Sequence, residues 1–201
     1  MTKVFLNYRV TDEPFGVVLL DRELSRRFGS EEVFLASKSI PLGADWERRM
    51  FQAVEQSAAL LVVMGVDWLG EQRPDGSRRL NDPGDFVRRE ILTAAALGKV
   101  IVPVRFNSER IDRAEFPDEL SWLAKLQDSE VRFRSVERDL DHLANRLAAE
   151  VKGLSVRLPR VAGGTTFTMS GTADNVVQAE RIDISGDFHA GPRYGRSRRT
   201  S

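Results

Sequence analysis

The chain has 201 residues, enough for one domain of ordinary size and a tail but too few for two large domains. Hydrophobic residues make up 41% of the sequence and charged residues 30%, so most of the chain can bury a core. There is no cysteine, which excludes disulfide scaffolds, thiolate metal sites and cysteine nucleophiles. Only His142 and His189 could serve as histidine ligands or bases, which disfavours a metal centre and Ser-His-Asp catalysis.

The formal net charge of zero hides an asymmetry between the two ends of the chain. Residues 152–201 hold eight lysines and arginines against four aspartates and glutamates, and residues 1–151 carry the opposite excess. An acidic folded part disfavours a nucleic-acid partner. No apolar run reaches the ~18 residues of a membrane span, and the first residues lack the apolar core of a signal peptide. We therefore expect a cytoplasmic protein without a membrane partner.

Short apolar runs alternate with segments of helical periodicity over residues 1–155. Strands are expected at residues 4–6, 33–35, 60–64, 100–104 and, more weakly, 131–133. Helices are expected at residues 15–28, after Asp45, after Asp85 and at residues 136–151, with a loop at residues 37–43. This alternation predicts an α/β fold of the flavodoxin-like kind, a five-stranded parallel sheet with helices on both faces.

Residues 156–201 have a different character, rich in glycine, serine and threonine and without a helical stripe. We predict a mostly irregular tail rather than a second globular domain. One part of it, at about residues 175–189, alternates β-branched side chains and is followed by a glycine turn signal.

Common nucleotide-binding motifs are absent from the sequence. No G-x-G-x-x-G follows the first expected strand, and no G-x-x-x-x-G-K-[ST] occurs, so a glycine loop that cradles phosphate is not supported. His142 lies between Asp141 and Leu143 in the last expected helix, where a surface histidine is the ordinary case. With thiols and histidines set aside, carboxylates are the remaining chemistry.

Four segments occur in order at characteristic spacings, and together they resemble a Toll/interleukin-1 receptor (TIR) domain of the bacterial kind. They are residues 4–9 (VFLNYR), 40–46 (IPLGADW), 85–91 (DFVRREI) and 98–104 (GKVIVPV). The resemblance covers roughly residues 3–150. It implies an enzyme that cleaves NAD⁺ between nicotinamide and ribose, with NAD⁺ as substrate, no cofactor and no metal.

The resemblance also implies which residues form the site. The family's catalytic glutamate lies in the helix before the fourth strand, with an aromatic residue four positions earlier, which corresponds to Glu90 and Phe86. On a helical wheel, Glu90 lies about 80° from the centre of the apolar stripe, at the margin of the core. That stripe consists of Val87, Ile91, Ala94 and Ala95. Without the resemblance, Glu90 would be taken for a solvated helix residue.

Four further positions are candidate substrate contacts. Tyr8 and Arg9 follow the first strand, and the resemblance places them near the nucleotide, with Arg9 facing the phosphates. The alternative is a half-buried tyrosine and a surface arginine. Lys38 and Gly43 lie in the loop after the second strand, which in this family contacts substrate and a neighbouring domain. Trp46 is expected to be a core anchor.

Residues 175–189 resemble the short amyloid-type signalling motifs at the ends of some bacterial immune effectors, whose partner would carry a matching motif. An inert tail is the alternative, since charges at Glu180, Arg181, Asp183 and Asp187 repel in register. If the motif stacks, it would concentrate the domains.

Three functions remain open at this stage. The first is an NAD⁺ glycohydrolase of an immune or cell-death system, activated by assembly with other TIR domains and releasing nicotinamide with ADP-ribose or a cyclic isomer. The second is a non-catalytic TIR–TIR scaffold, which Phe86 in place of the more usual tryptophan and Val10 after Arg9 favour. The third is an interaction module driven by its tail.

Overall fold

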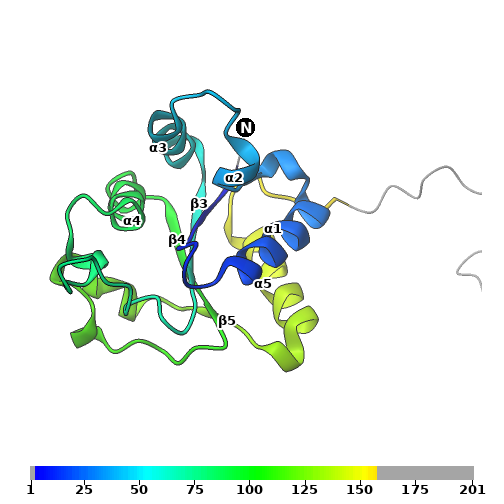
Figure 1. Cartoon of the computed structure of the whole chain (residues 1–201). Helices are drawn as coiled ribbons and strands as arrows, with labels where there is room; N and C mark the ends of the chain where they lie inside the picture. The colour runs from blue at the N-terminus through cyan, green and yellow to red at the C-terminus, as the bar shows by residue number, and fades with distance from the viewer. Residues whose placement is uncertain (1–2, 158–201) are drawn as a thin grey trace, which may run out of the picture. The chain divides into compact units, whose positions relative to one another are not determined.

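The computed structural model describes residues 3–157 and contains one five-stranded parallel sheet (Figure 1). The strand order is β2-β1-β3-β4-β5, so the chain starts inside the sheet, moves to one edge and then crosses to the other side. The strands are β1 (Val4–Asn7), β2 (Val33–Phe34), β3 (Ala59–Met64), β4 (Val100–Phe106) and β5 (Ser129–Val131). The expected α/β fold and flavodoxin-like order are confirmed.

Helices cover both faces of the sheet, with α1 and α5 on one face and α3 and α4 on the other (Figure 1). The α-helices are α1 (Pro14–Phe28), α2 (Ala36–Ser39), α3 (Trp46–Gln56), α4 (Phe86–Ala96) and α5 (Val136–Glu150). Short 3₁₀ helices occupy the connections: Ser30–Glu32, Arg79–Asn81, Arg113–Glu115, Asp118–Lys125 and Phe133–Ser135. Within residues 3–157, none of these helices is long and apolar enough to cross a membrane.

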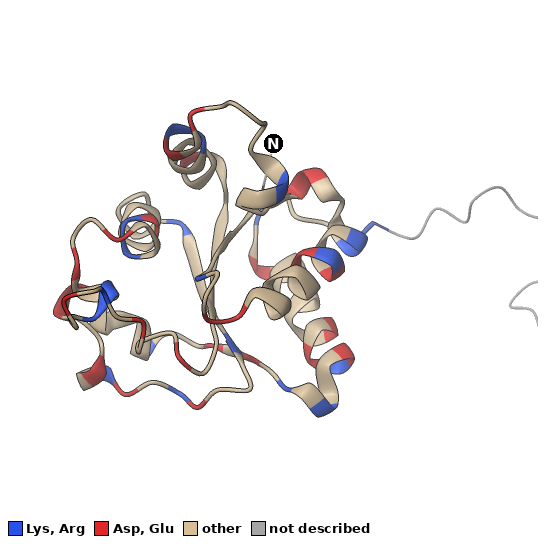
Figure 2. Cartoon of the chain, viewed as in Figure 1, with Lys and Arg blue, Asp and Glu red and all other residues tan. Residues whose placement is uncertain are grey.

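The sheet separates two hydrophobic cores, because successive residues of a strand point to opposite faces. Val4 and Leu6 of β1 pack in the core beneath α1 and α5, whereas Phe5 packs in the core beneath α3 and α4. All six residues of the central strand β3 are buried, as expected for a parallel strand with both faces covered. Charged side chains lie mainly on the surrounding helices and loops (Figure 2).

The two predicted helix caps are present. Asp45 Oδ1 accepts a hydrogen bond from the backbone N–H of Arg48 over 3.1 Å, and Asp85 Oδ1 accepts one from Arg88 over 2.9 Å. Each carboxylate satisfies a backbone donor that the first helical turn leaves free. The cap at Asp85 matters most here, because it fixes the start of α4.

Several expected boundaries were wrong. The first strand, expected at residues 4–6, extends to Asn7, and the third, expected at residues 60–64, begins at Ala59. The strand expected at residues 33–35 ends at Phe34, since Leu35 is the residue immediately before α2. This short helix occupies part of the expected loop at residues 37–43. The fourth strand extends beyond residue 104 to Phe106. The fifth strand was expected at residues 131–133 but spans Ser129–Val131. Of the expected run, only Val131 is buried.

Residues 158–201, nearly all of the tail, lie outside the described residues. The predicted irregular character of residues 156–201 and the motif at about residues 175–189 therefore remain predictions, as does the domain boundary at residue 155.

The depth of the core beneath α1 gives a direct test of this packing. Leu24 is fully buried, so Leu24→Ala should lower the free energy of unfolding by about 2–5 kcal/mol, through lost burial and the cavity left behind. Leu42 is fully exposed, and Leu42→Ala should change it by no more than ~0.5 kcal/mol. Urea denaturation of both variants makes the comparison, and equal effects would contradict this arrangement of the core.

Candidate functional site

The candidate site lies at the carboxyl end of β1, where the strand order reverses. The chain passes from β1 to β2 on one side and later to β3 on the other, so β1 and β3 flank the switch point of the sheet. In open α/β sheets, ligands bind in the crevice at such a point. The last residue of β1 is Asn7, which is fully buried and aligned with Val62 of β3.

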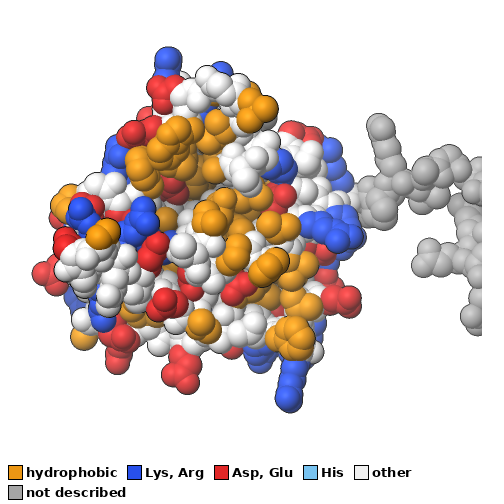
Figure 3. All heavy atoms as spheres, viewed as in Figure 1, with side chains coloured by type: hydrophobic (Ala, Val, Ile, Leu, Met, Phe, Trp, Pro, Cys, Tyr) orange, Lys and Arg blue, Asp and Glu red, His pale blue; other side chains and the backbone are white. Residues whose placement is uncertain are grey.

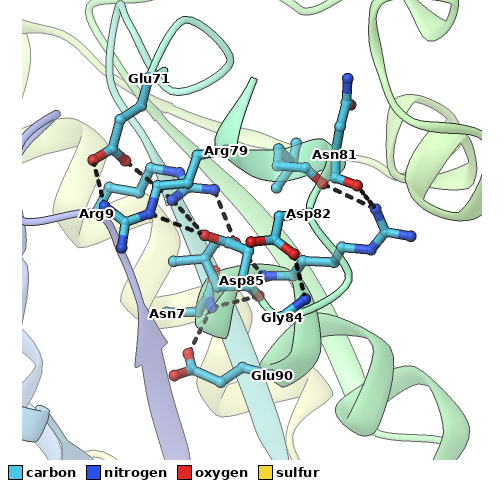
Figure 4. A network of polar contacts seen from close by, with 12 residues as sticks. Asn7, Arg9, Glu71, Arg79, Asn81, Asp82, Gly84, Asp85 and Glu90 are labelled. Atoms are coloured by element: carbon cyan, nitrogen blue, oxygen red, sulfur yellow. Dashed lines mark hydrogen bonds and ion pairs between the residues drawn. The ribbon is translucent and has the colours of Figure 1, made fainter. Parts of the chain in front are cut away.

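Glu90 of α4 points towards Asn7 (Figure 4). The Nδ2 amide of Asn7 donates to Glu90 Oε2 over 2.7 Å and to the backbone carbonyl of Val87 over 3.1 Å. Glu90 is only 5% exposed, so it lies deeper than the core margin that the helical wheel predicted. The reason is that α4 packs against the end of β1, which covers a side chain that the helix alone would leave at its edge.

Burial raises the pKa of Glu90 to about 8. The hydrogen bond from Asn7 opposes this effect, while the negative charge of Asp85 adds to it and the positive charges of Arg9 and Arg89 lower the pKa. Removal of the carboxylate from water is the largest of these effects. A glutamate with such a pKa, held in place at a switch point, is typical of a functional group.

Two oxygen atoms beside this hydrogen bond lack partners among the described residues. Asn7 Oδ1 is buried without a hydrogen bond. Glu90 Oε1 also receives no donor from residues 3–157, since the carboxylate is bonded only through Oε2. Buried acceptors are normally paired, so the open Asn7 Oδ1 marks a place where a ligand can donate, and Glu90 Oε1 is a second open acceptor beside it.

An ion-pair network fixes the neighbouring start of α4 (Figure 4). Arg9 forms a bidentate pair with Asp85, with nitrogen–oxygen distances of 2.9 and 3.0 Å, and both side chains are buried. A second contact of 3.0 Å joins Arg9 to Glu71, which also pairs with Arg79. The guanidinium is thus neutralised by carboxylates, which differs from the expected role of facing phosphates.

An aromatic cluster of Trp46, Phe51 and Phe86 lies between α3 and α4, beside the site. Trp46 and Phe86 meet edge to face with ring centroids 4.6 Å apart. Arg89 lies over the rings of Phe51 and Phe86 and pairs with Glu47 over 2.8 Å. Trp46 is 49% exposed, so the expectation of a core anchor was wrong: as the first residue of α3, it covers Phe86 at the surface.

The other three predicted contacts are not brought to Glu90. Tyr8 packs against the core beneath α1 and α5, on the opposite face of the sheet. Lys38 pairs with Asp21 of α1 over 2.5 Å. Gly43 lies in an exposed loop with φ of +77°, a left-handed conformation that favours glycine.

Asn7, Asp85 and Glu71 are the components of the site that the sequence analysis missed. Asn7 carried a signal, because an amide that ends an otherwise apolar strand shares its face with Phe5 and hence with α4. Asp85 was recognised only as a helix cap. Glu71 carried no signal, since it lies in a polar loop far along the chain from Arg9.

Two surface cavities lie elsewhere. The larger, of about 400 Å³, opens between β5 and α5. Asp139 and Arg132, which line it, pair with each other over 3.1 Å, and this ion pair lowers the pKa of Asp139 well below its usual range. Within residues 3–157, no three histidine, aspartate or glutamate side chains cluster as a metal site would require. The buried carboxylate beside Asn7 therefore remains the stronger candidate.

Residues 4–148 match the TIR domain family (TIR_2), which covers well over half of the chain. The chain belongs to the TIR domain family.

Two solved structures are similar to this chain at low sequence identity, and the first of them shares its fold. The TIR domains of the activated Roq1 resistosome, which directly recognises the pathogen effector XopQ, match with a TM-score of 0.54 and 13% identity, over 73% of this chain and 99% of that one. A metazoan TIR-STING receptor from C. gigas in complex with 2',3'-cGAMP matches with a TM-score of 0.46 and 13% identity, over 70% of this chain and 39% of that one. A comparison with curated proteins gives no significant match.

The buried ion pair between Arg9, which follows β1, and Asp85 predicts a large loss of stability when the cation is removed. Arg9→Met leaves Asp85 buried without its bidentate partner, which should lower the free energy of unfolding by about 3–5 kcal/mol. Arg22 of α1 is exposed, and Arg22→Met should have an effect within ~0.5 kcal/mol. Chemical denaturation provides both values, and a small effect of Arg9→Met would mean that Asp85 finds other compensation.

The raised pKa of Glu90 predicts a pH dependence of stability. The folded-state pKa of about 8 exceeds the ordinary value of 4.5, so the folded state holds the extra proton between these values. Stability therefore falls as the pH rises through this window. Glu90→Gln should abolish this decline. At about pH 9 its free energy of unfolding should exceed that of the wild type by a few kcal/mol, since each unit of pKa shift corresponds to about 1.4 kcal/mol.

The matched control is Glu55→Gln, because Glu55 is an exposed residue of α3. Its denaturation curves should follow those of the wild type at every pH. Parallel pH profiles for the wild type and Glu90→Gln would show instead that Glu90 titrates normally.

Proposed function

We propose that this TIR domain is an NAD⁺ glycohydrolase in which Glu90 is the catalytic residue. The observation that carries the proposal is the buried carboxylate of Glu90, held by Asn7 at the switch point of the sheet. The family includes NAD⁺-cleaving members, and the other two carboxylates of the site, Asp85 and Glu71, are paired with arginines, which leaves Glu90 as the one acidic group without an ion pair. The reaction must therefore need only one.

Cleavage of the nicotinamide–ribose bond meets this condition. The bonding electron pair leaves with nicotinamide, which changes from a cationic ring to a neutral one, so no acid is needed to protonate the leaving group. Ordinary glycosides do need one, because their leaving oxygen departs as an anion. Water then adds to the ribose carbon and loses a proton, giving ADP-ribose; attack by the adenine instead gives a cyclic isomer.

The role of Glu90 is electrostatic. Positive charge grows on the ribose as the bond breaks, and an ionised carboxylate fixed beside it stabilises that charge in a site of low dielectric. Its unpartnered Oε1 can also accept from the ribose hydroxyls and orient the sugar.

Ionisation of Glu90 is coupled to substrate binding in this proposal. With a pKa of about 8, the carboxyl is mostly protonated at neutral pH in the free protein. An opposite charge nearby lowers the pKa of an acid, and the oxidised nicotinamide ring carries that charge. Binding of NAD⁺ therefore favours the anion that the reaction needs.

The surrounding residues take supporting roles. In this proposal Phe86, which precedes Glu90 by one turn of α4 and contacts Trp46 edge to face, is the aromatic residue beside the substrate. Arg9 holds Asp85 and with it the start of α4, so that it orients Glu90 rather than meeting the phosphates. Tyr8, Lys38 and Gly43 remain candidate contacts through the loops that follow β1 and β2.

Assembly with other TIR domains is the proposed means of activation, in an immune or cell-death response. Figure 3 shows hydrophobic side chains gathered around α3 and the start of α1. Phe15 and Leu42 are almost fully exposed and Trp46 is half-exposed, which leaves apolar area for a neighbouring domain to cover. The likeness to TIR domains from an activated resistosome is in keeping with such a role.

Nicotinamide release from NAD⁺ at high protein concentration tests the proposal. The wild type should release nicotinamide, and Glu90→Gln should lower the rate by at least ~100-fold, because it keeps the shape but removes the charge that stabilises the ribose cation. Glu55→Gln, on the exposed face of α3, should retain the wild-type rate.

No release by the wild type, even where the protein visibly assembles, would favour the alternative of a non-catalytic TIR–TIR scaffold. Activity retained by Glu90→Gln would assign the reaction to another group. A chain shortened to residues 1–159 adds one distinction, since full activity there would make the tail unnecessary for activation.

A further inference from the structure

We infer that Asn7 is the positioning residue for Glu90: its amide fixes which carboxylate oxygen faces the substrate and favours the ionised form. This inference deepens the proposed function and rests on it for the identity of the reaction. The contact itself is structural, with Asn7 Nδ2 donating to Glu90 Oε2 over 2.7 Å.

The orientation of the Asn7 amide follows from its second contact. The atom that approaches Glu90 also lies 3.1 Å from the backbone carbonyl oxygen of Val87, which can only accept. An amide turned by 180° would place its oxygen against that carbonyl, so the nitrogen must occupy this position. Asn7 is therefore a donor to Glu90 in either protonation state of the acid.

A fixed donor makes the two oxygens of Glu90 unequal. Oε2 accepts the amide hydrogen bond, whereas Oε1 has no donor within residues 3–157. When Glu90 is protonated, the proton is favoured on Oε1, and when it is ionised, Oε1 is free to accept from a substrate. Asn7 thus leaves Oε1 of the acid available to the ligand and occupies Oε2 with its own hydrogen bond.

Asn7 can impose this geometry because its backbone belongs to the sheet, where it is aligned with Val62 of β3. It is the last residue of β1, which pairs with β2 on one side and β3 on the other, and its side chain is fully buried. Groups held by regular strands keep a productive geometry more accurately than groups on loops.

Other charges near Glu90 do not supply the same effect. Asp85, just before α4, opposes ionisation, whereas Arg9, after β1, and Arg89, on α4, favour it. Arg9 is engaged by Asp85, and Arg89 by Glu47 of α3. Each cation near Glu90 is therefore already paired with a carboxylate, and the direct donor is Asn7.

The cost of the arrangement also favours a functional role. Asn7 Oδ1 is buried without a partner among the described residues, and an unsatisfied buried acceptor destabilises a fold. An apolar side chain would fill the same space without this cost. An asparagine that leaves its oxygen open while its nitrogen holds Glu90 is typical of a site arranged for a ligand.

The primary experiment measures the pKa of Glu90 directly, by NMR titration of carboxyl-labelled glutamate in the full-length chain. Glu90→Gln identifies the signal through its loss. Asn7→Leu removes the donor at similar volume, and Asn7→Asp removes it and adds a competing acid. Asn145→Leu, on an exposed position of α5, is the matched control.

We expect the pKa of Glu90 to rise by about one to two pH units in Asn7→Leu, the amount set by one hydrogen bond to a charged acceptor. Asn7→Asp should raise it at least as much, because a second carboxyl opposes ionisation. Asn145→Leu should leave it unchanged. Thermal unfolding and circular dichroism establish that each variant is folded.

The pH profile of kcat/KM for nicotinamide release gives the functional readout, since it reports the pKa of the free enzyme. Asn7→Leu should lose about 10-fold or more at pH 7 and recover towards the wild-type rate above the raised pKa. A merely structural role would lower the rate by the same factor at every pH.

The two readouts separate failure of this inference from failure of the proposed function. An unchanged pKa of Glu90 in folded Asn7→Leu and Asn7→Asp would overturn the inference, whatever the activity. A pKa that rises while the wild type releases no nicotinamide would uphold the contact between Asn7 and Glu90 and reject the reaction. A uniform loss of rate with a raised pKa would also reject the positioning role.

Discussion

The buried ion pair between Arg9 and Asp85 connects the end of β1 to the start of α4, and the geometry of the site depends on it. Asp85 accepts hydrogen bonds both from the guanidinium of Arg9 and from the backbone N–H of Arg88 in the first turn of the helix. One carboxylate thereby sets both where α4 begins and how the helix lies on the sheet. Glu90 follows little more than one turn later, and this placement of the helix brings its carboxyl against Asn7.

The charges of Arg9 and Asp85 neutralise each other, but neither forms an ion pair with Glu90. Arg9 and Asp85 act on its ionisation in opposite directions, so much of their influence cancels, and burial dominates. An ionised carboxylate in this position loses much of its hydration free energy, whereas a neutral carboxyl group loses far less. The fold therefore favours the protonated acid, whereas the proposed function needs the ionised one. The hydrogen bond from Asn7 shifts the balance towards the ionised form.

The sequence predicted the sheet and most of its elements because strand and helix periodicities differ and each buried run is short. It predicted Glu90 and Phe86 as site residues through family resemblance, and the structure places both on α4. It did not predict that Arg9 would be paired, because Asp85 and Glu71 are 76 and 62 positions away along the chain. Nor could helical periodicity show that β1 would cover Glu90, or that Trp46 would lie half-exposed over Phe86, since both depend on how neighbouring elements pack.

The raised pKa of Glu90 has, on the proposed function, a consequence for which redox form of the dinucleotide is accepted. On the proposed function, a bound ligand must supply the positive charge that draws the proton from the buried acid. The oxidised nicotinamide ring provides it, but the dihydronicotinamide ring of the reduced dinucleotide is uncharged and leaves the acid as it was. On the proposed function, this electrostatic coupling would discriminate NAD⁺ from NADH, even though the two rings have almost the same size and outline.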